Sequence, residues 1–95
     1  MKKTVSFISV NYNGIVQTSD FIRSVQANVH SCPYEIIIVD NGSRNDEAAA
    51  LKLLFPCIKT IRSAENLGFA GGNNLALEYA VGDYLFFINV LLKIS

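Results

Sequence analysis

A run of four β-branched apolar residues, 36–39, constrains the fold of this 95-residue chain more than any other feature. Successive side chains of a strand point to opposite faces, so the run predicts a strand that is buried on both sides. Strands of this kind occur in parallel sheets that are covered by helices. Turn-forming residues 40–43 follow at once. The run therefore predicts an α/β fold.

The remainder of the chain alternates between short apolar segments and helical patterns. Further strands are predicted at 5–10, 57–61 and 84–88, and helices at about 47–55 and 71–80. Another helix is expected to be capped by Ser19 and to end at Cys32-Pro33, and Asn45 or Asp46 is expected to cap the helix at 47–55. The order β-α-β-α-β-α-β predicts a single domain over residues 1–95 with a mainly parallel sheet.

The polar and glycine-rich segments all follow strands. They are residues 11–14, 40–43 and 65–74, together with Asn89. Ligands of open α/β sheets bind outside the carboxyl ends of the strands, so these segments predict a ligand site there.

Each candidate in these segments has two interpretations. Asp40 either accepts hydrogen bonds from a nucleobase or ribose, or satisfies its own turn. Tyr12 either stacks on a base or packs over the first turn. The glycines before the helix at 71–80 either offer backbone amides to phosphate or allow a tight strand-to-helix crossing.

Charge and cysteine content exclude several classes of function. Eight basic and eight acidic residues cancel, so no nucleic-acid footprint is present. No apolar run approaches the length of about 20 residues that a membrane span needs. Cys32 and Cys57 fit neither a metal spacing nor a disulfide framework, which predicts two buried thiols in a reducing compartment and a cytoplasmic location. Ser43 has no histidine in a triad context, so nucleophilic catalysis is not expected.

Four segments together resemble a known family. They are Val-Ser-Phe-Ile-Ser-Val-Asn-Tyr-Asn-Gly at 5–14, Ile-Ile-Ile-Val-Asp-Asn-Gly-Ser at 36–43, Asn-Leu-Gly-Phe-Ala-Gly-Gly-Asn-Asn at 66–74 and Gly-Asp-Tyr-Leu-Phe-Phe-Ile-Asn at 82–89. The chain resembles the nucleotide-sugar-binding half of family-2 inverting glycosyltransferases with the A-type fold, and within them rhamnosyltransferase-like members. The resemblance implies a three-layer α/β/α half-domain with strand order 3-2-1-4.

The resemblance also implies roles for individual residues. Tyr12 would pack against the nucleobase, and Asp40 would hydrogen-bond it. The wall near the ribose and diphosphate would be formed by Asn66, Gly71, Gly72 and Asn73.

The chain departs from the family pattern after its last strand. Members carry a motif Asp/Asn-x-Asp, whose last Asp holds the Mg²⁺ or Mn²⁺ that neutralises the leaving diphosphate. Asn89 matches the first position, but Leu91 stands where the metal-binding Asp belongs. The acceptor-binding half and its catalytic base have no counterpart in the sequence. We therefore expect a truncated or frameshifted product that holds no metal.

Three functions follow from these observations. The first is transfer of a sugar from a UDP- or dTDP-linked donor to an unknown acceptor with inversion, in cell-surface polysaccharide synthesis, with this chain inactive on its own. The alternative is a non-catalytic remnant or weak nucleotide-binding module. A receiver-like domain is disfavoured, because Asn11 and Asn13 stand where its acidic cluster belongs. The uncharged strand at 84–88, or the tail at 90–94, predicts homo-oligomers.

Overall fold

The computed structural model of the protein describes residues 2–89. Four strands and three helices alternate along them. In chain order the elements are β1 (Val5–Asn11), α1 (Ile15–Asn28), β2 (Tyr34–Asn41), α2 (Glu47–Leu54), β3 (Lys59–Ser63), α3 (Gly68–Leu77) and β4 (Tyr84–Ile88).

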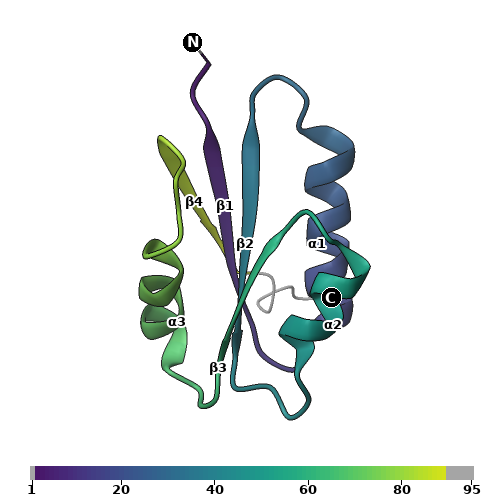
Figure 1. Cartoon of the computed structure of the whole chain (residues 1–95), viewed down its shortest axis with the longest axis vertical. Helices are drawn as coiled ribbons and strands as arrows, with labels where there is room; N and C mark the ends of the chain where they lie inside the picture. The colour runs from purple at the N-terminus through teal and green to yellow at the C-terminus, as the bar shows by residue number, and fades with distance from the viewer. Residues whose placement is uncertain (1, 90–95) are drawn as a thin grey trace.

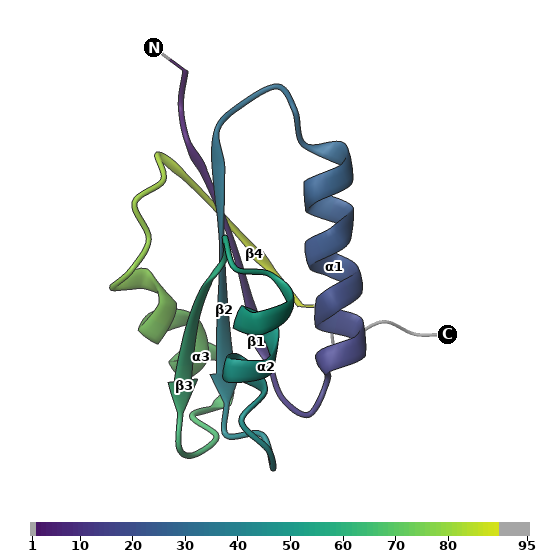
Figure 2. The ribbon, with the colours of Figure 1, turned by 45° about the vertical axis from the view of Figure 1, so that its right-hand side comes forward.

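The four strands form one parallel sheet in the order β3-β2-β1-β4. This confirms the predicted α/β class and strand order. Helices α1 and α2 lie on one face of the sheet and α3 lies on the other, as Figures 1 and 2 show from two directions. The chain therefore has the three layers that the resemblance implies.

The apolar run of β2 supplies both halves of the core. Ile36 and Ile38 pack with α1 and α2, in a cluster that includes Ile22 and Leu51. The intervening residues Ile37 and Val39 face α3, where they form a second cluster with Ile8 and Ala76. Because neighbouring residues of a strand face opposite sides, one short run is sufficient to join the three layers.

Two predicted helix starts are wrong. The first helix begins at Ile15, after Gly14, and Ser19 is buried inside it rather than capping it. The third helix begins at Gly68, three residues before the predicted start, and takes the glycines into its first turns. The predicted Asp46 cap of α2 is confirmed, since its side chain accepts a hydrogen bond from the backbone N–H of Ala49.

The strand predicted at 57–61 lies at 59–63 instead. Cys57 is in the turn before it and is exposed, and Cys32 is half-buried; both are free, so the expectation of two buried thiols is wrong. None of the helices formed by residues 2–89 has the length and hydropathy that crossing a bilayer requires.

A polar clasp joins the segment before β4 to the amino ends of β1 and β2. The carboxylate of Glu35 accepts hydrogen bonds from Ser6 Oγ at 2.6 Å and from the Val81 backbone N–H at 2.7 Å. It also forms an ion pair with Lys59 Nζ at 2.7 Å. Burial raises the pKa of Glu35, but the bonds from Lys59, Ser6 and Val81 outweigh burial and hold the pKa below its ordinary value. The charged form is therefore the one that holds this connection in place.

The sheet has two unlike edges. Strand β3 carries Lys59 and Arg62, and charge is a common protection of an edge strand. Strand β4 carries no charge, and four consecutive large apolar side chains on it, Tyr84 to Phe87, are 40–55% exposed. The exposure falls on both faces of the sheet, because successive residues of β4 alternate between them.

Candidate functional site

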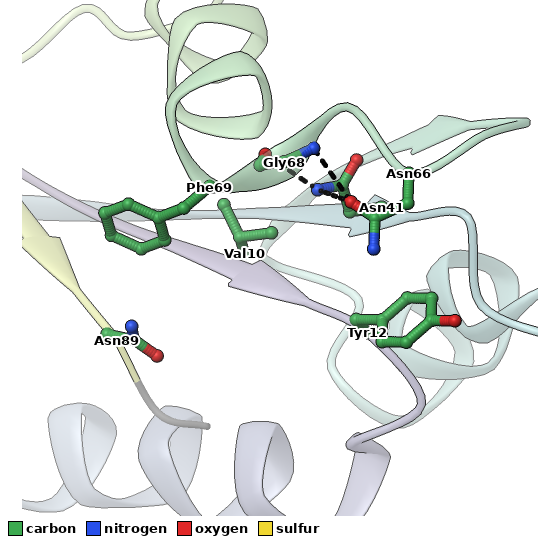
Figure 3. A pocket seen from close by; sticks show the side chains of 7 residues that line it. All are labelled: Val10, Tyr12, Asn41, Asn66, Gly68, Phe69 and Asn89. Carbon is green, nitrogen blue, oxygen red and sulfur yellow. Dashed lines mark hydrogen bonds between the residues drawn. The ribbon is translucent and has the colours of Figure 1, made fainter. Parts of the chain in front are cut away.

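A pocket of about 220 Å³ lies at the carboxyl ends of the strands. It is built from four separate segments of the chain, namely the end of β1, the end of β2, the loop that leads into α3, and the residue after β4 (Figure 3). The lining residues are Val10, Tyr12, Asn41, Asn66, Gly68, Phe69 and Asn89. The pocket occupies the edge of the sheet where the sequence predicts a ligand site.

The pocket lining combines two aromatic rings with side-chain amides. Tyr12 and Phe69 lie on either side of Val10 in Figure 3 and are 43% and 51% exposed. No side chain in the lining carries a formal charge at neutral pH. Such a surface suits a planar, uncharged and polar group that stacks and hydrogen-bonds.

Asn41 is the most connected of these amides. Its Oδ1 accepts a hydrogen bond from the backbone N–H of Leu67 at 2.8 Å. Its Nδ2 donates to Asn66 Oδ1 at 3.1 Å and to the Gly68 carbonyl at 3.0 Å. The end of β2 is thereby joined to the loop before α3, which forms one wall of the pocket.

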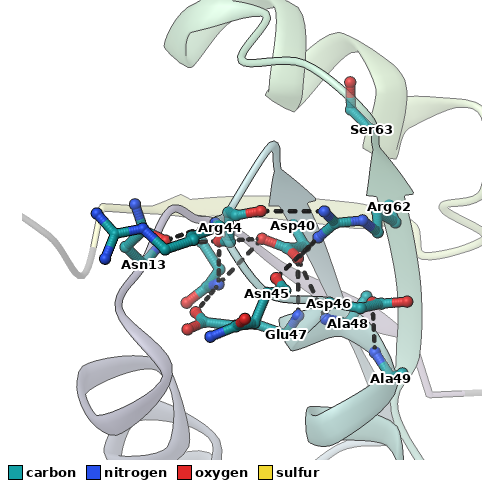
Figure 4. A network of polar contacts seen from close by, with 12 residues as sticks. Asn13, Asp40, Arg44, Asn45, Asp46, Glu47, Ala48, Ala49, Arg62 and Ser63 are labelled. Carbon is teal, nitrogen blue, oxygen red and sulfur yellow. Dashed lines mark hydrogen bonds and ion pairs between the residues drawn. The ribbon is translucent and has the colours of Figure 1, made fainter.

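Asp40 precedes Asn41 and points to the opposite face of the sheet. It is fully buried, and its polar contacts are drawn in Figure 4. Its Oδ1 accepts hydrogen bonds from Ser43 Oγ and from Asn11 Nδ2, the latter at 3.3 Å. Its Oδ2 forms an ion pair with Arg62 Nη1 at 2.5 Å. These partners lie at the end of β1, in the turn after β2 and near the end of β3, so the carboxylate ties the ends of the three strands together.

The first turn of α2 also binds this carboxylate. The backbone N–H groups of Glu47 and Ala48 donate to Asp40 Oδ2 at 3.0 and 3.3 Å. These groups have no partner within the helix, and the positive end of the helix dipole favours a negative charge beside them. Both oxygens of Asp40 are therefore occupied by the protein itself.

The loop that carries Tyr12 is held by its neighbour Asn13. The backbone of Asn13 has φ of +48°, a conformation that asparagine adopts more readily than most residues. Its N–H donates to Ser43 Oγ at 2.8 Å, and its Oδ1 accepts from the backbone N–H of Arg44 at 2.8 Å. The two loops that follow β1 and β2 are therefore joined directly, which fixes the position of the Tyr12 backbone beside the pocket.

The residues predicted from the sequence divide into three groups. Tyr12 and Asn66 line the pocket, as does Asn89. Gly72 lies behind the lining, where an added Cβ would be 2.9 Å from Val10 Cγ2, and Gly71 and Asn73 belong to the same helix without lining the pocket. Asp40 lies on the opposite face, and its predicted bond to a nucleobase stays a prediction.

Sequence reasoning missed Asn41 and Phe69. Asn41 was treated as part of a turn, yet the alternation of β2 places it on the same face as Ile37 and Val39. Continuing that alternation by one residue is the signal that could have found it. Phe69 stands among small residues at the start of α3, and no local pattern marks its orientation.

The residues that face the pocket do not fit a divalent cation. Mg²⁺ and Mn²⁺ prefer carboxylate oxygens, and the polar side chains here are one phenol and three amides. Across residues 2–89, His, Cys, Asp and Glu side chains form no group of three or more that could hold a metal. Leu91, the position at which the resemblance puts the metal-binding Asp, lies outside the described residues.

Comparison with known proteins identifies relatives of this fold. Residues 6–90 match the sequence profile of the family described as Glycosyl transferase family 2. A search among curated proteins found no match. Two solved structures superpose well, a Pyrobaculum calidifontis mannosyltransferase in complex with GDP-Man and Mn²⁺ (TM-score 0.79, 19% identity) and S. aureus TarS 1-349 (TM-score 0.76, 22% identity). The match takes in 95% of this chain but 28% and 27% of theirs, so the chain spans about a quarter of their length.

Proposed function

The chain belongs to glycosyl transferase family 2, and from this we propose that the pocket lined by Tyr12, Asn41 and Phe69 binds the nucleotide part of a nucleoside-diphosphate sugar. The observation that carries the proposal is the composition of the pocket. Aromatic faces for stacking and amides for hydrogen bonding converge at the carboxyl ends of the parallel strands, with no charge to desolvate. The GDP-Man complex of a protein with the same fold supports a ligand of this class.

We propose that these residues bind and orient the donor rather than activate it. In inverting transfer a base takes the proton of the acceptor hydroxyl as that oxygen displaces the nucleoside diphosphate. The pocket lining offers no carboxylate for this step. The proposed reaction is transfer from a UDP- or dTDP-linked sugar, of a rhamnosyltransferase-like type, in the cytoplasm. The base and the neutralisation of the diphosphate would come from outside residues 2–89, so turnover by this chain alone is expected to be negligible.

Asp40 enters the proposal as a support of the site. Its oxygens hold Arg62, Ser43 and the start of α2, and Ser43 in turn holds the loop that carries Tyr12. A direct bond from Asp40 to the base requires that one of these partners be exchanged for the ligand.

A second candidate function is a nucleotide-binding module without catalysis. The uncharged lining favours it, because base and ribose can be bound there while the diphosphate extends into solvent. Binding that is weak and independent of Mn²⁺ would be its signature.

Calorimetric titration with UDP, dTDP and GDP, with and without Mn²⁺, tests the proposed site. We expect a measurable Kd for at least one nucleotide. Base stacking on an aromatic side chain contributes about 1–3 kcal/mol, so Tyr12→Ala and Phe69→Ala should each raise that Kd by about 5-fold or more. Tyr79→Ala is the matched control, since Tyr79 is exposed but does not line the pocket. A folded protein that binds none of the three nucleotides contradicts the proposal.

We also propose that two copies of the chain associate through β4. Across a two-fold axis, the edge of one β4 would pair antiparallel with the other, and Phe86 would face its counterpart at the centre. The strand is uncharged and the chain has a formal net charge of +0, so no electrostatic repulsion opposes this.

Light scattering across a concentration series tests this association. Phe86→Lys should shift the average mass towards the monomer, whereas Val16→Lys, at an exposed position on α1, should leave it unchanged. A wild-type protein that stays monomeric at millimolar concentration contradicts it.

A further inference from the structure

The orientation of the Asn41 amide is fixed by its partners. The backbone N–H of Leu67 requires an acceptor, and the carbonyl of Gly68 requires a donor. Only one of the two amide orientations satisfies both, and this orientation places Nδ2 against Asn66 Oδ1 as well (dashed lines in Figure 3). Both N–H donors of Asn41 are used within the protein, and Oδ1 keeps one lone pair. Towards a ligand, Asn41 can therefore act only as an acceptor.

The loop before α3 packs closely against the end of β2. Gly42 has φ of +79°, and an added Cβ there would lie 2.7 Å from the backbone nitrogen of Asn66. On the neighbouring helix, an added Cβ at Gly72 would lie 3.3 Å from Asn41 Nδ2. The backbones at 42 and 65–66 are thus in direct contact, with the Asn41 side chain enclosed between β2, the loop and α3. This enclosure explains why Asn41 is only 2% exposed although it lines a pocket.

The same three bonds position the pocket wall. Asn66 Oδ1 accepts from Asn41 and also from the backbone N–H of Gly68 at 2.8 Å, which closes a small ring of hydrogen bonds. Asn66, Gly68 and the adjoining Phe69 all line the pocket. Removing the Asn41 amide removes all three of its hydrogen bonds to the loop and leaves the bond from the Gly68 N–H to Asn66 Oδ1, which lies within the loop itself.

We propose that Asn41 is the positioning residue of the pocket, a latch that holds the loop 65–68 and Phe69 in place for the ligand. The inference rests on the proposed function for the identity of that ligand, a nucleotide that offers an N–H donor to Asn41 Oδ1. Ligand binding and the hydrogen bonds of Asn41 are coupled, since the bound ligand contacts a pocket wall that exists only while these bonds hold the loop in place. Loss of the latch lowers affinity without removing the stacking side chains themselves.

Amide hydrogen exchange followed by NMR tests the latch in the free protein. Asn41→Ala and Asn41→Asp should each speed exchange at Leu67 and Gly68 by about 10-fold or more. In Asn41→Asp a carboxylate replaces the donating nitrogen and repels Asn66 Oδ1 and the Gly68 carbonyl. Asn74→Asp, which makes the same change at an exposed position of α3, is the control and should leave both amides unchanged. Unchanged exchange at Leu67 and Gly68 in the Asn41 variants overturns the proposal.

A second variant keeps the test independent of folding. Asn66→Ala removes the loop side of the same contact at an exposed residue. It should speed exchange at Leu67, whose N–H is bonded to Asn41 and not to Asn66, even if the Asn41 variants fail to fold.

Nucleotide titration of the same proteins completes the test. The Kd should rise about 5-fold or more in the Asn41 variants and in Asn66→Ala, but not in Asn74→Asp. If the variants show faster exchange at Leu67 and Gly68 but an unchanged Kd, the positioning role is overturned. Absence of nucleotide binding by the wild type contradicts the proposed function, while the exchange data still decide whether the latch exists.

Discussion

Asp40 and Asn41 are neighbours in sequence, yet they lie on two faces of the sheet that differ in almost every respect. The Asp40 face is closed, and its carboxylate is fully buried among partners from β1, α2 and β3. The Asn41 face is open, and a pocket lies over it. The alternation of a single strand thus divides one polar motif into a residue that stabilises the scaffold and a residue that shapes the site.

The chemistry of each side chain suits its face. A buried carboxylate is tolerated only when it is paired and hydrogen-bonded, and Asp40 has both Arg62 and the first turn of α2. A neutral amide needs no counter-ion, so Asn41 can stand beside a pocket that has to exchange solvent for a ligand. The comparison predicts that substitutions on the Asp40 face lower the free energy of unfolding. Substitutions on the Asn41 face are expected to raise the Kd for the ligand.

Asp40→Ala should give the largest loss of stability. It removes an acceptor that Arg62, Asn11 and the first N–H groups of α2 share, and removal of one partner of a buried ion pair costs about 3–5 kcal/mol. Because Arg62 is partly exposed, we expect the lower end of that range in chemical denaturation. Asp20→Ala breaks an exposed pair with Arg23 and should cost less than about 0.5 kcal/mol. Equal effects of the two substitutions would remove the distinction between the faces.

A pair of glycine substitutions sharpens the comparison at the boundary of the two faces. Gly42 and Gly68 both have positive φ, +79° and +76°. An added Cβ at Gly42 would meet the backbone at 65–66, whereas at Gly68 nothing lies within 4 Å. Gly42→Ala should therefore cost about 2 kcal/mol or more, and Gly68→Ala about 1 kcal/mol from backbone strain alone. Thermal unfolding measures both, and a larger loss for Gly68→Ala would show that the loop is not seated against Gly42.

A smaller effect than those of Asp40→Ala and Gly42→Ala concerns a second paired carboxylate, the half-buried Glu35 at the amino end of the sheet. Its pKa is lowered in the folded protein, so its contribution to stability is complete above the ordinary pKa of about 4.3 and is lost as the pH falls through the folded value. Glu35→Gln should cost about 1–2 kcal/mol at pH 7 and little at pH 3. Denaturation at the two pH values checks this, and a cost that grows on acidification would have the wrong sign.

The fold follows from the sequence because its signals are local and agree with each other. The apolar run at 36–39, the Asp46 cap and the uncharged strand at 84–88 each indicate their own element. The strand order is not contained in these local signals, and its prediction came from the family resemblance. The wrong helix starts have a different cause. Ser19 is a good cap residue, but α1 begins a turn earlier because the chain leaves β1 through Asn13 and Gly14.

The site was harder to predict because it depends on side-chain direction. Tyr12, Asn66 and Asn89 could be located by their place after strands and in the loop before α3. Whether Asp40 or Asn41 faces the pocket depends on which face of β2 packs against α3 and which packs against α1 and α2. That packing is a property of the tertiary structure, and the identity of the motif residues alone does not determine it.

Chemical-shift mapping of the free protein titrated with UDP, dTDP or GDP tests the division into two faces most directly. On the Asp40 face, Thr18 Oγ1 donates to Asn11 Oδ1 at 2.6 Å, beside the bonds of Ser43 and Ala48 to Asp40. We predict that the backbone and side-chain amides of Asn41, Asn66 and Asn89 shift and saturate together, while the signals of Thr18, Ser43 and Ala48 stay in place. Shifts centred on Thr18, Ser43 and Ala48, with Asn41 and Asn66 unmoved, would contradict the division and make Asp40 the residue that meets the ligand.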